Sequence, residues 1–328
     1  MKKCIWGILP LLLFSVACSK EDDKEVVPDN NSGTSPEPAA LVTPRVAVYV
    51  DDPEGNQIEM TGILEIFPCI ENTAFYFGNY VNKKLGPFNG FYPLENGEIL
   101  DQYYRQLSLP EGEYNMVYWG TPVYNEPEYS NPAIVTPSVN IGSDMAALYL
   151  QLRANRDSTY APVYDIVHAV KEADITYEDL SVALTRVVAG VKVSVTMNDS
   201  STFSPNIASM EVRIGSIAEK INYYTAQAEN KTKTVKFGLV RSDDGKTMSN
   251  ATVMLFPSAA NPLFELRITM QDGTLHTLSQ NLGSTLSANT RLTLNIVMGD
   301  IIVGETSGHF TIEEWEEASE TIEFPVAY

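Results

Sequence analysis

The feature that most constrains the fold is a long stretch of alternating residues near the middle of the chain. Residues 182–197, VALTRVVAGVKVSVTM, are rich in β-branched side chains, and their second half alternates between apolar and polar. A period of two places every second side chain on the same face of a strand, so the stretch predicts a half-buried β-strand. Gly190 lies inside it and indicates a bulge or a close approach of another backbone.

Shorter segments of the same kind occur along the rest of the chain, separated by turn residues. An Asp-Gly pair at 272–273 between two such segments predicts a tight hairpin, and residues 242–245, SDDG, predict another. Evidence for helices is thin, and one short helix is expected at 217–228. The sequence therefore predicts an all-β fold built from paired β-sandwiches. Strands are expected at 45–50, 61–67, 74–77, 102–109, 114–119, 148–152, 210–217, 234–240, 251–256, 266–270, 274–278, 290–297, 310–312 and 321–326.

The first 18 residues have the form of a bacterial secretion signal. Two lysines precede an apolar run at 5–16, which is shorter than the roughly 20 residues of a stable membrane span. Small residues then lead to Cys18, as in the lipobox of bacterial lipoproteins, although Ser15 stands where Leu is usual. We predict cleavage before Cys18 and lipid on its sulfur, which would hold the chain in a membrane through several acyl chains. The alternative is a plain secretory signal with an incidental cysteine.

The residues after the cysteine predict a disordered tether. Residues 19–44 are rich in Pro, Ser, Asn, Asp and Glu and have no apolar period, so they cannot bury enough surface to fold. Their first five residues, SKEDD, resemble the surface-export signal of Bacteroidetes lipoproteins, and a solvated run of charges is the alternative. Residues 153–180 also lack a strong period. We therefore expect an N-terminal β-sandwich domain at 45–165 and a C-terminal β-sandwich domain at 166–328.

Charge and cysteine content exclude two classes of protein. The formal net charge is −20, with 42 acidic and 22 basic residues. Nucleic-acid binding depends on clustered Lys and Arg, so this composition disfavours it. After removal of the signal segment the cysteines are Cys18 and Cys69. Lipidation would consume the first, so no disulfide framework is expected, and the apolar sequence around Cys69 predicts a buried, inert thiol.

No catalytic or metal-binding motif is visible. His168, His276 and His309 lack metal-ligand spacing, and the chain contains no CxxC, GxSxG, GxGxxG or P-loop pattern. We therefore predict a non-enzymatic protein without a metal or cofactor. Aromatic residues crowd one part of the N-terminal half and could stack on sugar rings, so a glycan-binding surface lipoprotein is an alternative; core packing is the other explanation. These aromatics are Tyr103, Tyr104, Tyr114, Tyr118, Trp119, Tyr124 and Tyr129.

Several motifs together resemble one bacterial family. They are LPEGEY at 109–114, VYWG at 117–120, LTRVVAGVKV at 184–193, SANTRLTL at 287–294 and FTIEEW at 310–315. With the lipobox and tether, they resemble the fimbrillin-like superfamily of Bacteroidetes type V pili, closest to its FimB-like lipid-anchored anchor and accessory subunits. No single motif is diagnostic. The resemblance implies two transthyretin-like β-sandwich domains, fimbrillin partners, and a place on the surface of the outer membrane.

The same resemblance implies assembly by strand exchange. In that family a protease cuts after an arginine in the leader, and the exposed groove accepts a terminal strand from the next subunit. Arg45 lies at the junction of tether and body and is either such a cleavage point or an ordinary linker residue. Cutting there would separate the body from Cys18, which an anchor should avoid. The alternating tail is either a donor strand or the last strand of its own sheet, with Thr321, Ile322, Glu323, Phe324 and Val326 as the candidate donor residues.

Overall fold

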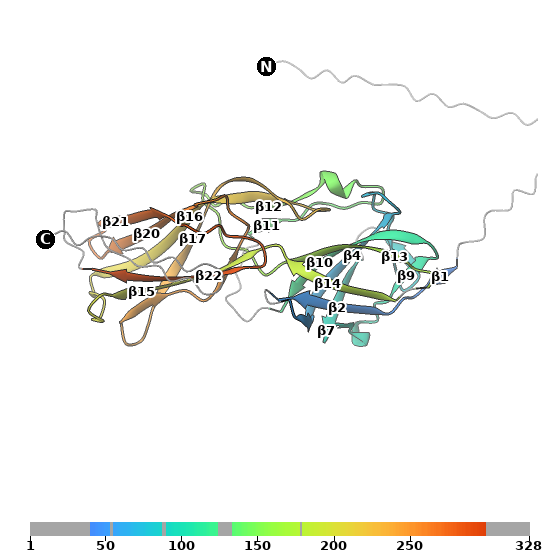
Figure 1. The fold of residues 1–328 in the computed structure, drawn as a ribbon, viewed down its shortest axis with the longest axis horizontal. Coiled ribbons are helices and arrows are strands. Elements are labelled where there is room, and N and C mark those ends of the chain that lie inside the picture. Colours follow the sequence, from blue (N-terminus) through green and yellow to red (C-terminus); the bar gives the residue numbers. More distant parts are fainter. Residues whose placement is uncertain (1–39, 53–54, 87–89, 124–132, 178, 300–328) are drawn as a thin grey trace, which may run out of the picture. The chain divides into compact units, whose positions relative to one another are not determined.

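The computed structural model describes residues 40–52, 55–86, 90–123, 133–177 and 179–299 (Figure 1), and these belong to one compact unit. The described residues form three β-sheets and two short 3-10 helices, Asp101–Tyr103 and Met145–Ala147, and contain no α-helix. The predicted all-β fold is confirmed. Within the described part of the chain, no helix has the length and apolar character needed to cross a bilayer.

The first large sheet closes on itself. Its eight strands run in the order β14-β13-β10-β4-β7-β8-β2-β3, and an additional pairing joins β14 to β2. That closing pair is parallel, with Leu180 opposite Val46 and Thr185 opposite Asp51. The strands are β2 (Val46–Asp51), β3 (Gln57–Glu59), β4 (Gly62–Ile70), β7 (Phe91–Glu95), β8 (Glu98–Ile99), β10 (Glu113–Pro122), β13 (Val167–Asp174) and β14 (Leu180–Arg186).

A four-stranded sheet accompanies this barrel. Its order is β1-β9-β5-β6, and all of its pairings are antiparallel. The strands are β1 (Leu41–Val42), β5 (Asn79–Val81), β6 (Lys84–Gly86) and β9 (Leu107–Pro110). The buried side chains of β9, Leu107 and Leu109, belong to the same apolar core as the barrel interior.

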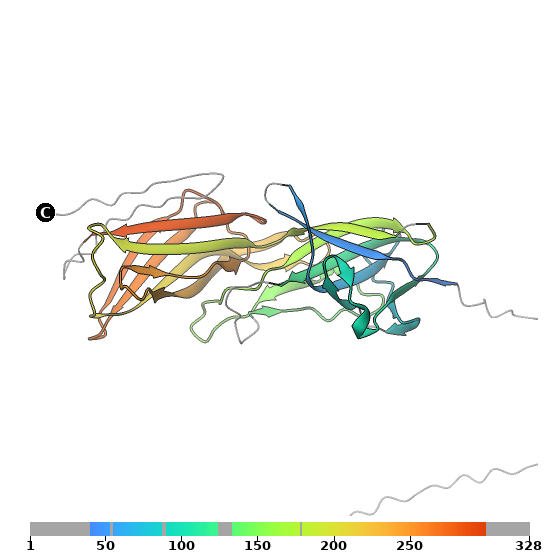
Figure 2. The same cartoon turned by 90° about the horizontal axis from the view of Figure 1, so that it is seen from below.

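The remaining strands form a ten-stranded sheet. It is built mainly around the long hairpin β16–β17, with β20 and β21 added beside β16 and with β15 carrying β19, β18 and β22. Figure 2 shows β22 lying beside β15, with which it pairs in parallel. The strands are β11 (Ile134–Val135), β12 (Tyr149–Leu152), β15 (Ala189–Met197), β16 (Ile207–Asn222), β17 (Ala228–Arg241), β18 (Thr247–Ser249), β19 (Val253–Leu255), β20 (Leu263–Met270), β21 (Leu275–Asn281) and β22 (Arg291–Met298).

The strands of the two large sheets are not separated by a single boundary in the sequence. Strands β11 and β12 precede β13 in the sequence but pair within the ten-stranded sheet, whereas β13 and β14 return to the first sheet. The chain therefore passes from one sheet to the other between Pro122 and Ile134, back again before Val167, and across once more after Arg186. The division into domains 45–165 and 166–328 remains a prediction about independent folding; the hydrogen bonding assigns 167–186 to the first sheet.

The alternation that predicted the strands also explains their burial. In β2, residues 46, 48 and 50 are buried, and the residues between them are half-buried. Strand β10 differs because both of its faces are covered. Its even-numbered residues Met116 and Tyr118 belong to the barrel core, whereas Val117 and Trp119 belong to the core of the ten-stranded sheet. A strand buried on both faces reads as a continuous apolar run, which fits the sequence EYNMVYWG.

The prediction of a helix at 217–228 is wrong. These residues form the end of β16, a turn, and the start of β17. A register shift lies between Ile214 and Ile217, and Ser216 has a positive φ of 56°. This bulge places both Ile217 and Ala218 in the core, with Ile221 four residues later. The resulting spacing of apolar residues is the same as on the apolar face of a helix, and this is why the sequence pattern wrongly predicted a helix.

The turn predictions are confirmed. Residues 242–245 join β17 to β18, with the Gly245 N–H donating to the Ser242 carbonyl at 2.9 Å. Gly273 closes the β20–β21 hairpin with a φ of +88°, a conformation that glycine adopts without strain. The Asp272 side chain accepts a hydrogen bond from the Thr274 N–H at 2.8 Å. Both turns therefore use the chemistry that their sequences predict.

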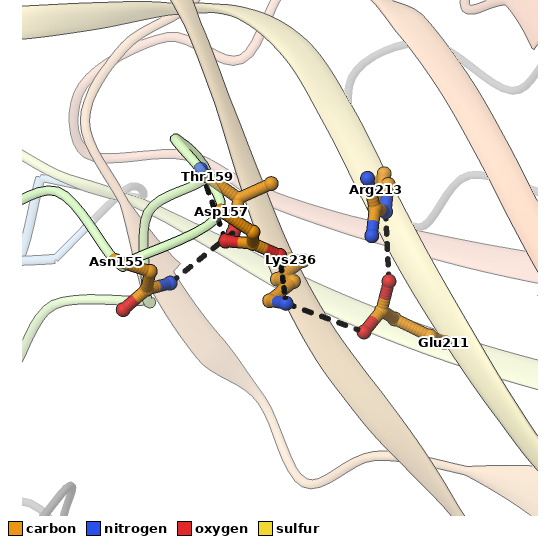
Figure 3. Close-up of polar contacts among 6 residues, drawn as sticks. All are labelled: Asn155, Asp157, Thr159, Glu211, Arg213 and Lys236. Carbon is orange, nitrogen blue, oxygen red and sulfur yellow. Dashed lines mark hydrogen bonds and ion pairs between the residues drawn. The ribbon is translucent and has the colours of Figure 1, made fainter.

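A surface ion-pair network fixes the loop after β12 (Figure 3). Lys236 on β17 pairs with Asp157 of the loop at 2.5 Å and with Glu211 of β16 at 3.9 Å. Glu211 also accepts from the Arg213 Nε at 2.7 Å. The Lys236 ammonium and the Thr159 hydroxyl lower the pKa of the Asp157 carboxyl. These partly exposed groups hold the loop along β17, so we assign them a structural role.

Candidate strand-pairing site

Arg45 lies where β2 begins, and its backbone is held on both sides. Its N–H donates to the Asp179 carboxylate at 3.0 Å, and its carbonyl accepts from the Leu180 N–H at 2.8 Å. Its guanidinium, 71% exposed, pairs with Glu98. The side chain is thus accessible, whereas the adjoining peptide bonds belong to an ordered junction. A protease requires an extended, unpaired backbone, so cleavage here would require local opening of the barrel seam.

The two residues of β1 tie the segment before Arg45 to the body. Leu41 and Val42 pair with Pro110 and Leu109 of β9, and Val42 packs against the barrel core. The Thr43 hydroxyl also hydrogen-bonds the Ser108 hydroxyl at 3.1 Å. Removing the chain up to Arg45 would therefore expose the edge of β9, while β2 would keep its pairing with β14.

The ten-stranded sheet offers open edges. Among the described residues, β22 pairs with β15 alone, and β21 pairs with β20 alone. Residues 292, 294, 296 and 298 of β22 are buried, so one face of that strand is already part of the core. An edge strand with one buried face is able to accept a further strand.

The other predicted residues of this site lie outside the described residues. These are the lipidation residue Cys18 and the candidate donor residues Thr321, Ile322, Glu323, Phe324 and Val326. Their roles remain predictions.

The aromatic cluster of the N-terminal half separates into core and surface residues. Tyr114, Tyr118 and Trp119 are buried in β10. Tyr103 and Tyr104 are 54% and 81% exposed and lie at the short 3-10 helix before β9. Tyr124 and Tyr129 lie outside the described residues. Among the described members of this cluster, Tyr103 and Tyr104 are therefore the residues whose rings are exposed.

Sequence reasoning missed the aromatic stack that joins β10 to the end of β16. Trp119 stacks on Tyr223 with ring centroids 4.9 Å apart, and its Nε1–H donates to the Tyr223 carbonyl at 3.0 Å. His168 lies against the same indole at 4.5 Å. The three residues are distant in sequence and follow no shared motif, so no pattern could have identified them.

Neither the described histidines nor Cys69 has the geometry of a reactive site. His168 is buried, and this burial lowers its pKa to about 4. His276 lies in β21, and His309 is outside the described residues. Cys69 is buried, as predicted, and this burial raises the pKa of its thiol to about 12, which disfavours the reactive thiolate. In the described part of the chain, no group of three or more His, Cys, Asp or Glu side chains could hold a metal ion.

Comparison with known proteins identifies the family. The family model of the fimbrillin-A associated anchor proteins Mfa1 and Mfa2 matches residues 41–321. No curated protein sequence matches the chain.

Solved structures share the fold at low sequence identity. The fimbrial anchor protein Mfa2 from Porphyromonas gingivalis has a TM-score of 0.52 at 11% identity, covering 87% of this chain and 100% of that chain. A protein from Bacteroides thetaiotaomicron, provisionally described as polysaccharide-binding, has a TM-score of 0.52 at 13% identity, covering 81% and 95%. A provisional adhesin from Bacteroides ovatus has a TM-score of 0.51 at 9% identity, covering 87% and 96%.

Proposed function

Because the chain belongs to the family of fimbrillin-A associated anchor proteins, we propose that it is a lipid-anchored anchor or accessory subunit of a fimbrium. The match over residues 41–321 carries this proposal. Lipid on Cys18 would hold the protein in the outer membrane, with its body exposed on the cell surface, and its partners would be fimbrillin subunits. It would act by binding rather than by catalysis.

Strand exchange is the proposed means of binding. Strand β22, which pairs with β15 alone among the described residues, would supply the acceptor edge, and the alternating tail would supply the strand. Pairing a strand with an edge satisfies backbone groups on both partners and buries alternate apolar side chains. In the tail, Ile322, Phe324 and Val326 occupy alternate positions, so an extended tail would present these three apolar side chains on one face.

An uncut N-terminus is part of the proposal. The hydrogen-bonded backbone at Arg45 and the pairing of β1 with β9 argue against ready proteolysis. An anchor needs that connection intact, because its lipid lies on the far side of it. A stalk subunit would be released by the same cut.

The test is purification from isolated outer membrane, followed by mass spectrometry of partners and of the mature N-terminus. A co-purified fimbrillin and an N-terminus at lipidated Cys18 are expected. An N-terminus at Val46 would contradict the anchor role and indicate a polymerising subunit.

Two tail variants separate strand donation from ordinary folding. The double variant Ile322→Asp and Phe324→Asp should abolish recovery of fimbrillin without lowering the melting temperature. The matched variant Thr321→Asp, on the other face of the tail, should retain the partner. A lower melting temperature in the double variant would show that the tail completes its own sheet.

Glycan binding is the second candidate function. It is favoured by the exposed rings of Tyr103 and Tyr104 and by the fold shared with the provisionally polysaccharide-binding protein. Binding of the purified protein to a glycan array, lost on Tyr104→Ala, would support it. The absence of any array signal, together with recovery of a fimbrillin, would eliminate it.

A further inference from the structure

A pocket of about 320 Å³ opens where β4 and β10 meet β12 and the end of β16. The described residues of its lining combine aliphatic, aromatic and hydroxyl-bearing side chains with one carboxylate, that of Glu65, and include no Lys or Arg. The lining residues that carry the inference are Ile63, Glu65, Trp119, Leu150, Tyr164 and Tyr223. Its size suits a single short side chain or a small organic molecule.

Glu65 is the unusual member of this lining. It is half-buried among apolar neighbours, with Leu64 and Ile66 beside it in β4 fully buried. Burial raises the pKa of its carboxyl, and no charge partner opposes this effect. Among the described residues, the Glu65 side chain has no hydrogen bond and no ion pair, whereas its backbone lies between those of Trp119 and Phe91 in the sheet. A partly desolvated carboxylate without a protein donor would gain from a ligand that supplies one.

The surroundings of the carboxylate favour a cation. Burial, and then the charge of Glu65, raise the pKa of both Tyr164 and Tyr223, so the carboxylate lies near the two phenols. Trp119 has Tyr223 and His168 against it, which leaves Tyr164, 39% exposed, as the ring open to a ligand. A cation next to a carboxylate and an aromatic ring gains from both.

The aliphatic part of the lining favours an alkyl stem. Ile63 is 43% exposed at the mouth, whereas Leu150 is buried. Lysine-like groups bury their methylene chain along apolar surface while the charged head finds a polar partner. The strongly negative net charge of the whole chain would also attract a cation to this surface.

We propose that this pocket binds an alkylammonium group, with the Glu65 carboxylate as its ion-pair partner and Tyr164 as its aromatic wall. The group would be a lysine side chain of another protein or a free small amine; both carry the same chemistry. The site is independent of the fimbrial role, since neither strand edges nor lipid take part in it.

Calorimetric titration of the full lipoprotein in detergent tests the proposal with matched ligands. Nα-acetyl-lysinamide should bind with one-to-one stoichiometry, whereas the same compound acetylated on its side-chain nitrogen should not bind. A short lysine peptide and n-butylammonium distinguish the sources, because the tighter ligand identifies which kind of molecule the pocket fits. Equal binding of the charged and the acetylated compound would overturn the proposal.

Variants locate the binding in the pocket. Glu65→Gln should weaken binding at least tenfold, and Tyr164→Leu severalfold. Glu59→Gln and Tyr177→Leu, which alter exposed positions outside the pocket, should leave affinity unchanged. Unchanged melting temperatures would show that the variants fold. Wild-type affinity in Glu65→Gln, or binding of saccharides but no amine, would refute the assignment.

Discussion

The buried histidine at the aromatic stack predicts a specific loss of stability in acid. His168 lies against Trp119, and its Nε2 has no hydrogen-bond partner among the described residues. Burial lowers its pKa from 6.5 to about 4, although a hydrogen bond to the backbone of Tyr224 acts in the opposite direction. The folded chain therefore keeps this imidazole neutral at pH values where the unfolded chain protonates it.

The sign and the size of this change in stability follow from proton linkage. The contribution of His168 is fully present above pH 6.5 and is lost as the pH falls toward 4, because only the unfolded state gains the proton in that interval. A difference of about 2.5 pH units, at about 1.36 kcal/mol each, corresponds to about 3 kcal/mol of unfolding free energy. Carboxyl groups also titrate near this pH range. The effect of His168 must therefore be measured as a difference in unfolding free energy between the wild type and a variant without this histidine.

The assay is urea unfolding of the wild-type chain and of His168→Phe at pH 7 and pH 4. Phenylalanine keeps a ring beside Trp119 and cannot be protonated. Between the two pH values, the wild type should lose about 3 kcal/mol more than the variant. His276→Asn serves as the control and should behave as the wild type does. Equal acid sensitivity of the wild type and His168→Phe would refute the reasoning.

Further predictions concern the residues that pack around β10. Gly120→Ala should cost about 1–3 kcal/mol in thermal or urea unfolding, because a Cβ there would lie 2.6 Å from the Val167 side chain; a neutral result would show that the barrel relaxes. Trp119→Ala should cost about 3–5 kcal/mol in the same assay, since it removes the stack on Tyr223 and the bond to its carbonyl. Cys69 should resist alkylation at pH 8 until denaturant is added, and rapid native labelling would contradict its burial.

Local sequence patterns predicted much of the secondary structure. The alternation at 189–197 became β15, and the Asp-Gly pair at 272–273 became a hairpin turn, because both are decided by neighbouring residues. The bulge at Ser216 was missed because it depends on which strands flank β16. Its side chains were then assigned to a helix by their spacing alone.

Long-range arrangements were beyond the sequence pattern. Nothing local indicates that β14 would pair in parallel with β2, some 130 residues earlier, or that β11 and β12 would join the ten-stranded sheet. The same holds for the pocket, since Glu65, Tyr164 and Tyr223 come from three separate segments. Glu65 appeared in the sequence as one acidic residue among many, and only its burial distinguishes it.

The parallel pairing of β2 with β14 has a mechanical consequence. Once the short β1–β9 pairing has opened, a pull applied through the chain before Arg45, along the axis of β2, would act on all the ladder bonds from Val46 to Asp51 at once. Such shear loading requires many bonds to break together, whereas peeling an antiparallel hairpin from its end breaks them one at a time. The start of β2 is therefore suited to bear tension, which the proposed anchor role would require.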